Sequence, residues 1–600
     1  MSDLIRDAPF GQFVRWATNK KYFKYEEELD GFQIPWQVAI QEGKETINAT
    51  DVADELASVS SDHSIARIKT EDGVSHLQEA HLARTRSREA TIPFSEERFD
   101  VERQLSLERP KSNIIVPQKT ADGVILVDWY STDDQANPQN WSSGKKVWVA
   151  FVLFLYTLVV YAASAIFTSG QDQIMKKFGL NYAEGSVILS IYVIGYGVGP
   201  LLFSPLSEIP VFGRNIPYIT TFALFVILSI PLAVVDNYPG LLVLRFLTGV
   251  MGSPCLATGG ATIQDMYSLI KLPYGLTAWV AAAFCAPAIG PLLSGFAVPI
   301  LGWRWAFWET VIMSAPIWLL WFFTMPETSA DNILLRRARR LRALTASQST
   351  STPSTPSYLS PSEIASQNQS FASTLYSALT IPFLITLRDP AVLFTNLYTS
   401  LIYGTYYSFF EAFPLTYIGI YGFSIGELGV VYTSAIIPGA LLGISTYVAY
   451  QWFYLEPDMR RRGPREQEHR LVPATIAVWL LPISLFWFGW TAREETHWAV
   501  SIVGLVFFGY GAFVLFQCIF MYLPLTYPKY AASLFAMNDA LRSGMAAGSI
   551  IYAHPMYVNL GVGRGVSILG GLMVGGCAGV VALYFFGKGL REKSKFAGAP

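Results

Sequence analysis

The sequence contains few charged residues and few cysteines. Charged side chains make up 15% of its 600 residues, against about 25% in soluble domains. The net charge is only −2, so the chain lacks the basic surplus of a nucleic-acid-binding protein. Hydrophobic residues reach 52% and the mean hydropathy is +0.34, although the first quarter is polar. This composition predicts an all-α polytopic membrane protein that contacts the lipid bilayer and has no nucleic-acid partner.

The few cysteines offer neither a disulfide framework nor a metal site. All lie inside apolar stretches, without a CxxC spacing or a histidine-rich neighbour. No nucleophile elbow, phosphate loop or ATP-binding motif occurs in a suitable context. We therefore expect no catalytic residues, no metal and no cofactor. The N-terminus lacks an apolar signal-peptide core, so the first span is expected to act as the insertion signal. The cysteines are Cys255, Cys285, Cys518 and Cys577.

A long polar region, residues 1–145, precedes the apolar part of the chain. Residues 50–112 are rich in Glu, Arg, Ser and Asp and poor in aromatic residues, a composition that cannot bury enough apolar surface to fold. The first forty residues contain more aromatic side chains, which suit docking on another surface. We predict a cytoplasmic N-terminal region, 1–145, that is largely disordered.

Apolar segments fill most of the remaining chain and divide into two sets of six. A polar segment, 326–388, separates the sets and contains the basic run RRARRLR, Arg336–Arg342. We predict two six-helix halves, 146–325 and 389–587, followed by a cytoplasmic tail, 588–600. The expected spans are 147–168, 186–206, 216–235, 239–262, 273–297, 306–325, 390–417, 427–450, 471–491, 499–522, 531–552 and 565–587.

Basic residues in the connections predict the orientation of the chain in the membrane. Lys and Arg concentrate in alternate connections, among them Lys145–Lys146, Arg336–Arg342 and Arg460–Arg462. Cytoplasmic loops carry the excess of Lys and Arg in membrane proteins, so both termini are predicted to be cytoplasmic. The basic run after the sixth span can be such a topology signal, or it can bind anionic lipid headgroups.

The fifth apolar stretch, Leu272–Trp303, contains no Asp, Glu, Lys, Arg or His. Small side chains recur there every four residues, which lets helix backbones approach closely in lipid. Pro287 and Pro291 remove backbone donors, so the helix is expected to bend. These features suit the middle of a moving bundle, and they also fit an ordinary packing helix. The small residues are Ala278, Ala282, Ala286, Gly290 and Ser294.

Arg245, Glu309 and Glu411 are charged residues within three of the expected spans, and each has two interpretations. Arg245 lies well inside the fourth span, where an arginine either faces a functional cavity or extends from a helix end to the surface. Glu309, early in the sixth span, can bind protons or substrate, or be solvated at the interface. Glu411 lies among aromatic residues late in the seventh span, which suits amphipathic or cationic ligands or an interfacial aromatic belt.

Polar residues in the tenth and eleventh spans are further candidates for a substrate cavity. Asp539 and Arg542 are three residues apart, hence on one helical face. They can form a structural pair near the cytoplasmic edge or act in the cavity. Gln517 is a neutral hydrogen-bonding candidate in the tenth span. The candidate proton-coupling and cavity residues are therefore Arg245, Glu411, Asp539, Asn538 and Gln517.

A series of short motifs occurs in order along most of the chain. They are DDQANPQNW before the first span, GYGVGPLLFSPLSE with GRN around the second and third, LRFLTG in the fourth, CAPAIGPLLSG in the fifth, WRWAFW and MPET at the sixth, FFEAFP in the seventh and ASLFAMNDALRS in the eleventh. Together they resemble fungal drug:proton antiporters of the major facilitator superfamily, above all the yeast benomyl, methotrexate and azole resistance facilitators. The resemblance implies the major facilitator fold, with twelve transmembrane helices in two six-helix halves.

The resemblance gives the fifth span a role as the antiporter motif. Gly290, Pro291 and Gly295 match this motif, which shapes a helix interface and limits leak. Ala286 and Ser294 depart from it, because they stand where the general pattern has glycine. The exchange of one small residue for another keeps close packing plausible.

The resemblance also assigns a coupling residue and a gating loop. Arg245 matches the fourth-span arginine implicated in proton coupling. Glu208, Gly213 and Arg214 match the loop motif that gates the inward-closed state. The loop departs from the pattern, since Ser204 replaces glycine, Glu208 replaces aspartate and two extra residues precede Gly213.

The resemblance implies a proton-coupled exporter of amphipathic organic compounds at the plasma membrane, working by alternating access between the two halves. The proton gradient replaces any cofactor, and small organic substrates, protons and lipid are the expected partners of a monomer. Glu411 and Asp539 are the candidate proton carriers. Two alternatives stay open. One is a dedicated exporter of a single fungal toxin, secondary metabolite or polyamine, and the other is a non-transporting membrane sensor.

Overall fold

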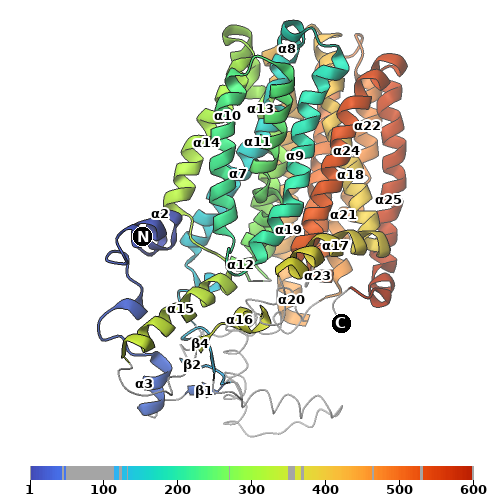
Figure 1. The fold of residues 1–600 in the computed structure, drawn as a ribbon. Helices are drawn as coiled ribbons and strands as arrows, with labels where there is room; N and C mark the ends of the chain where they lie inside the picture. Colours follow the sequence, from blue (N-terminus) through green and yellow to red (C-terminus); the bar gives the residue numbers. More distant parts are fainter. Residues whose placement is uncertain are drawn as a thin grey trace.

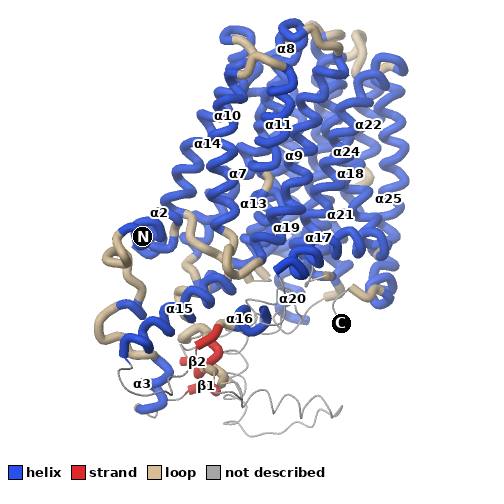
Figure 2. The backbone as a smooth tube through the Cα atoms, viewed as in Figure 1, coloured by secondary structure: helices blue, strands red, loops and turns tan. Residues whose placement is uncertain are grey.

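A computed structural model shows a bundle of long helices with a smaller module at one end (Figure 1). Helices dominate the fold, and the few short strands lie in the module (Figure 2). The N-terminal helices and the last turns of α25 lie at the same end of the bundle, which we call the terminal end. The structure describes residues 2–42, 46–48, 114–119, 124–131, 133–268, 270–348, 358–366, 371–462, 465–527 and 531–596.

Six spans form the first half of the bundle. The fourth span consists of two consecutive helices, because Pro254 has no N–H to donate to the carbonyl of Val250. The Ser253 hydroxyl donates to that carbonyl instead, with an Oγ–O distance of 2.7 Å. A short helix, α8 (Gln171–Phe178), joins the first two spans. The spans are α7 (Ser143–Ala165), α9 (Tyr182–Glu208), α10 (Asn215–Val234), α11 (Tyr238–Gly252) with α12 (Pro254–Met266), α13 (Leu272–Leu301) and α14 (Arg304–Thr324).

Six further spans form the second half. They are α18 (Pro390–Phe413), α19 (Ile425–Tyr450), α21 (Val472–Ala477) with α22 (Leu480–Thr491), α23 (Trp498–Thr526), α24 (Ala531–Leu560) and α25 (Val562–Lys593). Among the described residues, 10 helices are long and apolar enough to cross a membrane. The others, α18 and α24, contain 24 and 30 residues, enough for a span, and pack among them. The predicted arrangement of twelve spans is thereby confirmed.

Matching helix starts relate the two halves. The second span of each half begins with a capping box, Asn181 with Glu184 in α9 and Ser424 with Glu427 in α19. In each, the cap side chain accepts from the backbone N–H three residues on, and the glutamate accepts from the cap's own N–H. The second spans of the two halves therefore begin with the same local structure.

The two halves pack closely along two helix pairs, α9 with α24 and α13 with α19. Both pairs use glycine where the backbones meet. A Cβ at Gly197 of α9 would lie 2.4 Å from the Cβ of Ser543 in α24. A Cβ at Gly429 of α19 would lie 2.5 Å from the carbonyl oxygen of Pro291 in α13. These close approaches bring side chains from both halves into one buried core.

The module at the terminal end combines N-terminal residues with the segment between the halves. Strand β1 (Thr46–Asn48) pairs in parallel with β2 (Ile114–Val116), and β3 (Ile125–Leu126) with β4 (Tyr358–Leu359). The helices are α1 (Ser2–Asp7), α2 (Pro9–Ala17), η1 (Glu26–Glu28), α3 (Pro35–Gln41), α15 (Ala330–Gln348) and α16 (Pro361–Ser366). The next helix, α17 (Phe371–Arg388), packs against α9, α18 and α24 of the bundle. These elements differ from the disorder expected for 1–145, while residues 49–113 lie outside the described part of the chain.

Two arginines of the RRARRLR run hold the module together. Arg340 Nε lies 3.0 Å from a Glu27 carboxylate oxygen, and Arg337 Nη1 lies 2.7 Å from Asp134. The Tyr130 hydroxyl also donates to Glu27, at 2.8 Å. Burial alone would raise the pKa of Glu27, but the two arginines outweigh it and hold that pKa below its ordinary value. The basic run therefore has a structural role that its sequence did not reveal.

Candidate functional site

Arg245 lies in the core of the first half, on α11, with 1% of its surface exposed. Its guanidinium donates to three backbone carbonyls, those of Ala163 (2.9 Å), Ser164 (2.8 Å) and, from Nε, Ile188 (3.3 Å). The first two belong to the last turn of α7, which runs directly into the helix Ile166–Gly170. The arginine therefore ties the end of α7 to α9. The alternative interpretation, a side chain that extends to the surface, is wrong.

Aromatic rings surround the same guanidinium. Its carbon lies 4.5 Å from the ring centroid of Tyr192, 5.1 Å from Phe167 and 5.7 Å from Phe307. Within the described ranges, no carboxylate lies within ion-pair distance of Arg245. The charge is thus balanced by carbonyl dipoles and ring faces, which respond to a change in helix position.

A second arginine, Arg542, forms a buried ion pair with Asp539 of the same helix, α24. Its Nη2 lies 3.0 Å from the Tyr161 hydroxyl in the first half, and its guanidinium lies 4.6 Å from the ring centroid of Tyr403. The pair therefore joins the two halves as well as stabilising α24.

Tyrosine hydroxyls connect the surroundings of the two arginines. Tyr407 bonds Ser164, whose carbonyl accepts from Arg245, and it also bonds Tyr196, both at 3.0 Å. Tyr196 in turn bonds Tyr403, at 2.9 Å, beneath Arg542. This hydroxyl chain runs through α7, α9 and α18, so it crosses from one half to the other. Sequence reasoning missed it, and the only signal was the four-residue spacing of Tyr403 and Tyr407.

Glu411 lies at the opposite end of the core from the termini, with 2% of its surface exposed. It accepts from the Tyr182 hydroxyl at 2.6 Å and from the Ser186 hydroxyl at 3.1 Å, both on α9. His554 Nδ1 of α24 lies 3.5 Å from the same carboxylate, and its ring stacks on Tyr182 with a centroid distance of 3.5 Å. These four residues, which we call the outer cluster, link the two halves. The alternative interpretation of Glu411, a solvated carboxylate in an interfacial aromatic belt, is therefore wrong.

The other predicted polar residues lie apart from these groups. Asn538 donates to Asn396 and Thr399 of α18, at 2.9 and 2.8 Å. Gln517 donates to the carbonyl of Pro273 at 3.2 Å, across the interface between the halves. Glu309 is half-buried on α14. Asn538 and Gln517 thus stabilise helix packing in this conformation.

The antiporter motif lies where α13 meets helices of both halves. A Cβ at Gly290 would lie 2.6 Å from the carbonyl oxygen of Ala162 on α7. A Cβ at Gly295 would lie 2.9 Å from the carbonyl of Ile425 on α19. Ser294, which departs from the glycine pattern, donates to the Ser169 hydroxyl at 2.8 Å. The motif therefore forms a close backbone contact on two sides of α13.

The gating loop places its arginine against an acid at the end of the fourth span. Arg214 Nε lies 3.1 Å from Asp265, at the end of α12, and its Nη1 donates to Ser207 at 3.0 Å. Gly213 adopts a left-handed φ of +66°, and Glu327 of the MPET motif accepts from the backbone N–H of Arg214 at 2.9 Å. Glu208 is exposed. Asp265 and Glu327 are thus the acidic partners of this loop.

Comparison with known proteins decides the family. Residues 152–549 match the Major Facilitator Superfamily. The chain belongs to this family. Its members are transporters and not enzymes, so the chain is a membrane transporter, and the fold predicted from its motifs is confirmed.

Several fungal major facilitators are similar over most of the chain. MFS-type transporter pyvG of Aspergillus violaceofuscus is 44% identical over 481 residues, 80% of this chain and 87% of the relative. Fluconazole resistance protein 1 of Saccharomyces cerevisiae is 38% identical, over 78% of this chain and 84% of its own length. The Cycloheximide resistance protein of Candida maltosa is 31% identical over 100% of both chains. The resemblance to fungal drug-resistance transporters is confirmed.

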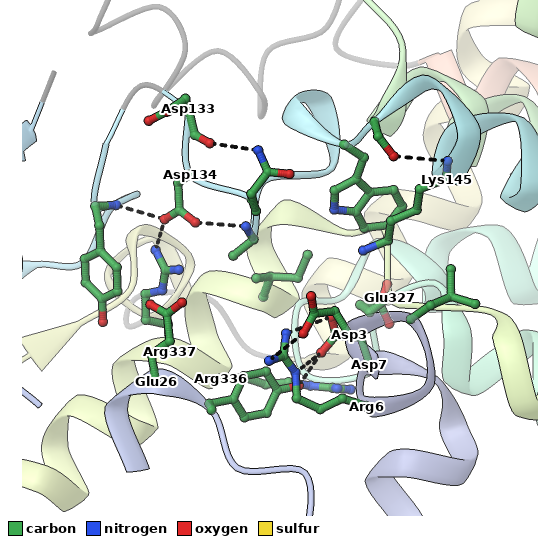
Figure 3. Close-up of a pocket in the computed structure, with 18 of the residues that line it drawn as sticks. Asp3, Arg6, Asp7, Glu26, Asp133, Asp134, Lys145, Glu327, Arg336 and Arg337 are labelled. Atoms are coloured by element: carbon green, nitrogen blue, oxygen red, sulfur yellow. Dashed lines mark hydrogen bonds and ion pairs between the residues drawn. The ribbon is translucent and has the colours of Figure 1, made fainter. Parts of the chain in front are cut away.

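A cavity of about 1190 Å³ lies in the module of this major facilitator and not between the two halves (Figure 3). Its walls come from α1, η1, the start of α7 and α15. Carboxylates and basic groups both line it, so it does not select a ligand of one charge. Figure 3 labels Asp3, Arg6, Asp7, Glu26, Lys145 and Arg336 among its lining residues. In the described part of the chain, no cluster of His, Cys, Asp and Glu has the arrangement of a metal site.

Replacing Gly290 with leucine is expected to reduce transport by this major facilitator at least about tenfold, because the added side chain would meet the α7 backbone. Transport and surface expression are measured together in cells. Ala286→Gly, one turn earlier on α13, should be tolerated, since it removes only a methyl group. Gly571→Leu is a matched control, because nothing lies within 4 Å of a Cβ at Gly571. Normal transport by Gly290→Leu would contradict the close contact.

Proposed function

We propose that the protein is a proton-coupled efflux transporter that exports amphipathic organic compounds across the fungal plasma membrane. Its two halves would alternate between inward- and outward-open states around the buried core. The similar fungal proteins named for fluconazole and cycloheximide resistance support small organic compounds as substrates. The tyrosine and phenylalanine side chains of the core supply ring faces for stacking on planar or cationic compounds.

The outer cluster is the observation that carries this proposal. Glu411, in the second half, is buried and accepts hydrogen bonds from two hydroxyls of the first half. Opening the bundle at that end must break these bonds and expose the carboxylate to water. Proton binding at Glu411 would weaken the link between the halves, so it would favour the outward-open state. Asp539 is the weaker candidate, because Arg542 already neutralises it on the same helix.

Arg245 supports coupling in the first half. Its bonds to α7 and α9 depend on the relative position of three helices. The hydroxyl chain from Ser164 to Tyr403 extends this dependence into the second half. We propose that the orientation follows the distribution of Lys and Arg, with both termini and the module in the cytoplasm, and that a monomer suffices for transport.

An efflux panel in a yeast strain that lacks its major drug pumps tests the proposal. Accumulation of azoles, cycloheximide, benomyl and fluorescent cationic dyes is measured with and without a protonophore. We expect reduced accumulation of several chemically unrelated compounds, reversed by the protonophore. Export of one compound alone would favour a dedicated exporter. Binding without efflux in reconstituted vesicles would favour a sensor, and protonophore-insensitive export would contradict proton coupling.

A further inference from the structure

Helix α2 and the turn after it carry an exposed aromatic and basic surface beside the membrane domain. We propose that this segment, residues 9–24, binds the anionic lipid headgroups of the inner leaflet. The bound segment would anchor the module to the bilayer next to the first half. The inference rests on the proposed cytoplasmic position of the termini, and it concerns a surface outside the transport core.

The contacts of α2 with two spans show where it lies relative to the membrane. The helix contacts α14 and α10, both of them spans of the first half. The Phe10 ring lies 4.8 Å from the Phe323 ring and 6.0 Å from the Phe322 ring, measured between centroids. Because α14 ends at Thr324, this contact places α2 where a span leaves the hydrocarbon. Figure 1 shows α2 beside the terminal end of α14.

Among the described residues, none covers the aromatic face of α2 beyond Phe10. Phe13 is 57% exposed and Trp16 is 78% exposed, and their ring centroids lie 6.0 Å apart. The opposite face is packed, since Gly11 and Arg15 are buried against the module. Amphipathic helices with such a face lie in the plane of the interface, and tryptophan is enriched at that depth. The bilayer surface is the apolar environment that the position of α2 makes available.

The turn after α2 holds an unfavourable backbone conformation. Asn19, Lys20 and Phe23 have φ values of +49°, +63° and +55°. Residues other than glycine seldom adopt this left-handed region. Arg15 stabilises the turn, because its Nη1 donates to the carbonyl of Phe23 at 2.5 Å. The backbone N–H of Lys20 also donates to the carbonyl of Arg15, at 2.7 Å. Strain of this kind persists only where neighbouring contacts impose it.

The strained turn presents basic side chains outward. Lys20, Lys21 and Lys24 are exposed, and so is Tyr22, at 56%. The Lys20 ammonium lies 4.0 Å from the carboxylate of Glu28, at the limit of an ion pair. Lysine and tyrosine side by side match the anionic headgroup layer, where cations meet phosphate and the ring lies at the interface. Charge and apolar contact therefore point to the same partner, an anionic lipid surface.

Lipid contact is tested with the full-length protein in nanodiscs. A fluorescent NBD group is attached at Ala17→Cys, on the exposed face of α2, or at Gln41→Cys, at the end of α3. Figure 1 shows α3 at the far side of the module from the bundle. Quenching by nitroxide-labelled lipid is compared in phosphatidylcholine and in phosphatidylcholine with phosphatidylserine, after subtraction of the labelling of the parent protein. We expect at least about twofold more quenching at position 17 than at 41 with phosphatidylserine present.

Charge reversal provides the second arm. The combined substitution Lys20→Glu, Lys21→Glu and Lys24→Glu should lower quenching at position 17 to the value at position 41, while Lys→Arg at the same positions should preserve it. Equal quenching at positions 17 and 41, or equal quenching in neutral and anionic nanodiscs, would overturn the proposal. The assay requires no transport, so loss of lipid contact with intact protonophore-sensitive efflux would refute only this inference. Lipid contact without efflux would refute only the proposed function.

Discussion

Arg245→Lys is expected to lower proton-coupled efflux at least about tenfold. The guanidinium donates at once to two carbonyls at the end of α7 and one in α9. A lysine ammonium keeps the charge but is a single point with a flexible stem, so it cannot reproduce this fork. Each hydrogen bond from a charged donor contributes about 1.5–3 kcal/mol. Losing one bond in only one conformation therefore changes the ratio of conformations about tenfold or more.

The measurement must separate coupling from folding, because Arg245 also ties α7 to α9. Surface expression and the thermal stability of purified Arg245→Lys and Arg245→Ala are compared with those of the parent. Tyr192→Phe is a matched control, since it retains the ring beneath the guanidinium and loses only a bond to the carbonyl of Val160, 2.8 Å long. We expect Arg245→Lys to reach the surface and bind drug without exporting it against a gradient. Normal efflux by that variant would rule out coupling through Arg245.

The sequence revealed Arg245 because a charge inside a long apolar run is conspicuous. The same reasoning found Glu411 and the Asp539–Arg542 pair. Local spacing also identified the face of small residues in the fifth span, because residues four apart must lie on one face of a helix; its role as an antiporter motif came from the resemblance. In these cases the informative signal was contained within a single helix.

The partners of those residues needed the tertiary structure. Tyr182, Ser186 and His554 surround Glu411, yet two of them lie more than 200 positions from it along the chain. Hydroxyl and imidazole groups are ordinary in a chain that contains 31 tyrosines, so nothing marks these particular ones. The gating arginine needed it too, because Asp265 and Glu327, the acids that contact Arg214, lie 51 and 113 positions away along the chain.

The module shows a different limit. Its N-terminal residues are polar, and composition measures only how much apolar surface a segment can bury by itself. Glu27 is held by Arg340, 313 positions further along the chain. Such pairing lets a polar segment fold against another part of the chain, and no local pattern reports it.

Glu411→Gln is expected to remove the dependence of efflux on external pH and to lower uphill efflux at least about tenfold. The amide imitates a permanently protonated carboxyl in size and charge. It retains one acceptor oxygen for the Tyr182 hydroxyl, but its NH₂ group cannot accept from Ser186. Tyr182 and His554 are the other titratable side chains of the outer cluster. Drug binding should be retained, because the substitution is nearly isosteric.

Efflux and drug binding are measured across a range of external pH in reconstituted vesicles. Glu427→Gln is the matched control, because this glutamate lies at the same end of the bundle in the capping box of α19 and is exposed to solvent. That control should lose only part of the cap stabilisation, about 1 kcal/mol, and keep its pH dependence. Ser186→Ala should weaken the link between the halves while leaving a titratable carboxylate, so its efflux should stay pH-dependent. Unchanged pH dependence in Glu411→Gln would move the proton site to Asp539. The Arg542 pair would then have to open during each cycle, since a carboxylate held in a buried ion pair cannot take up a proton without losing its partner.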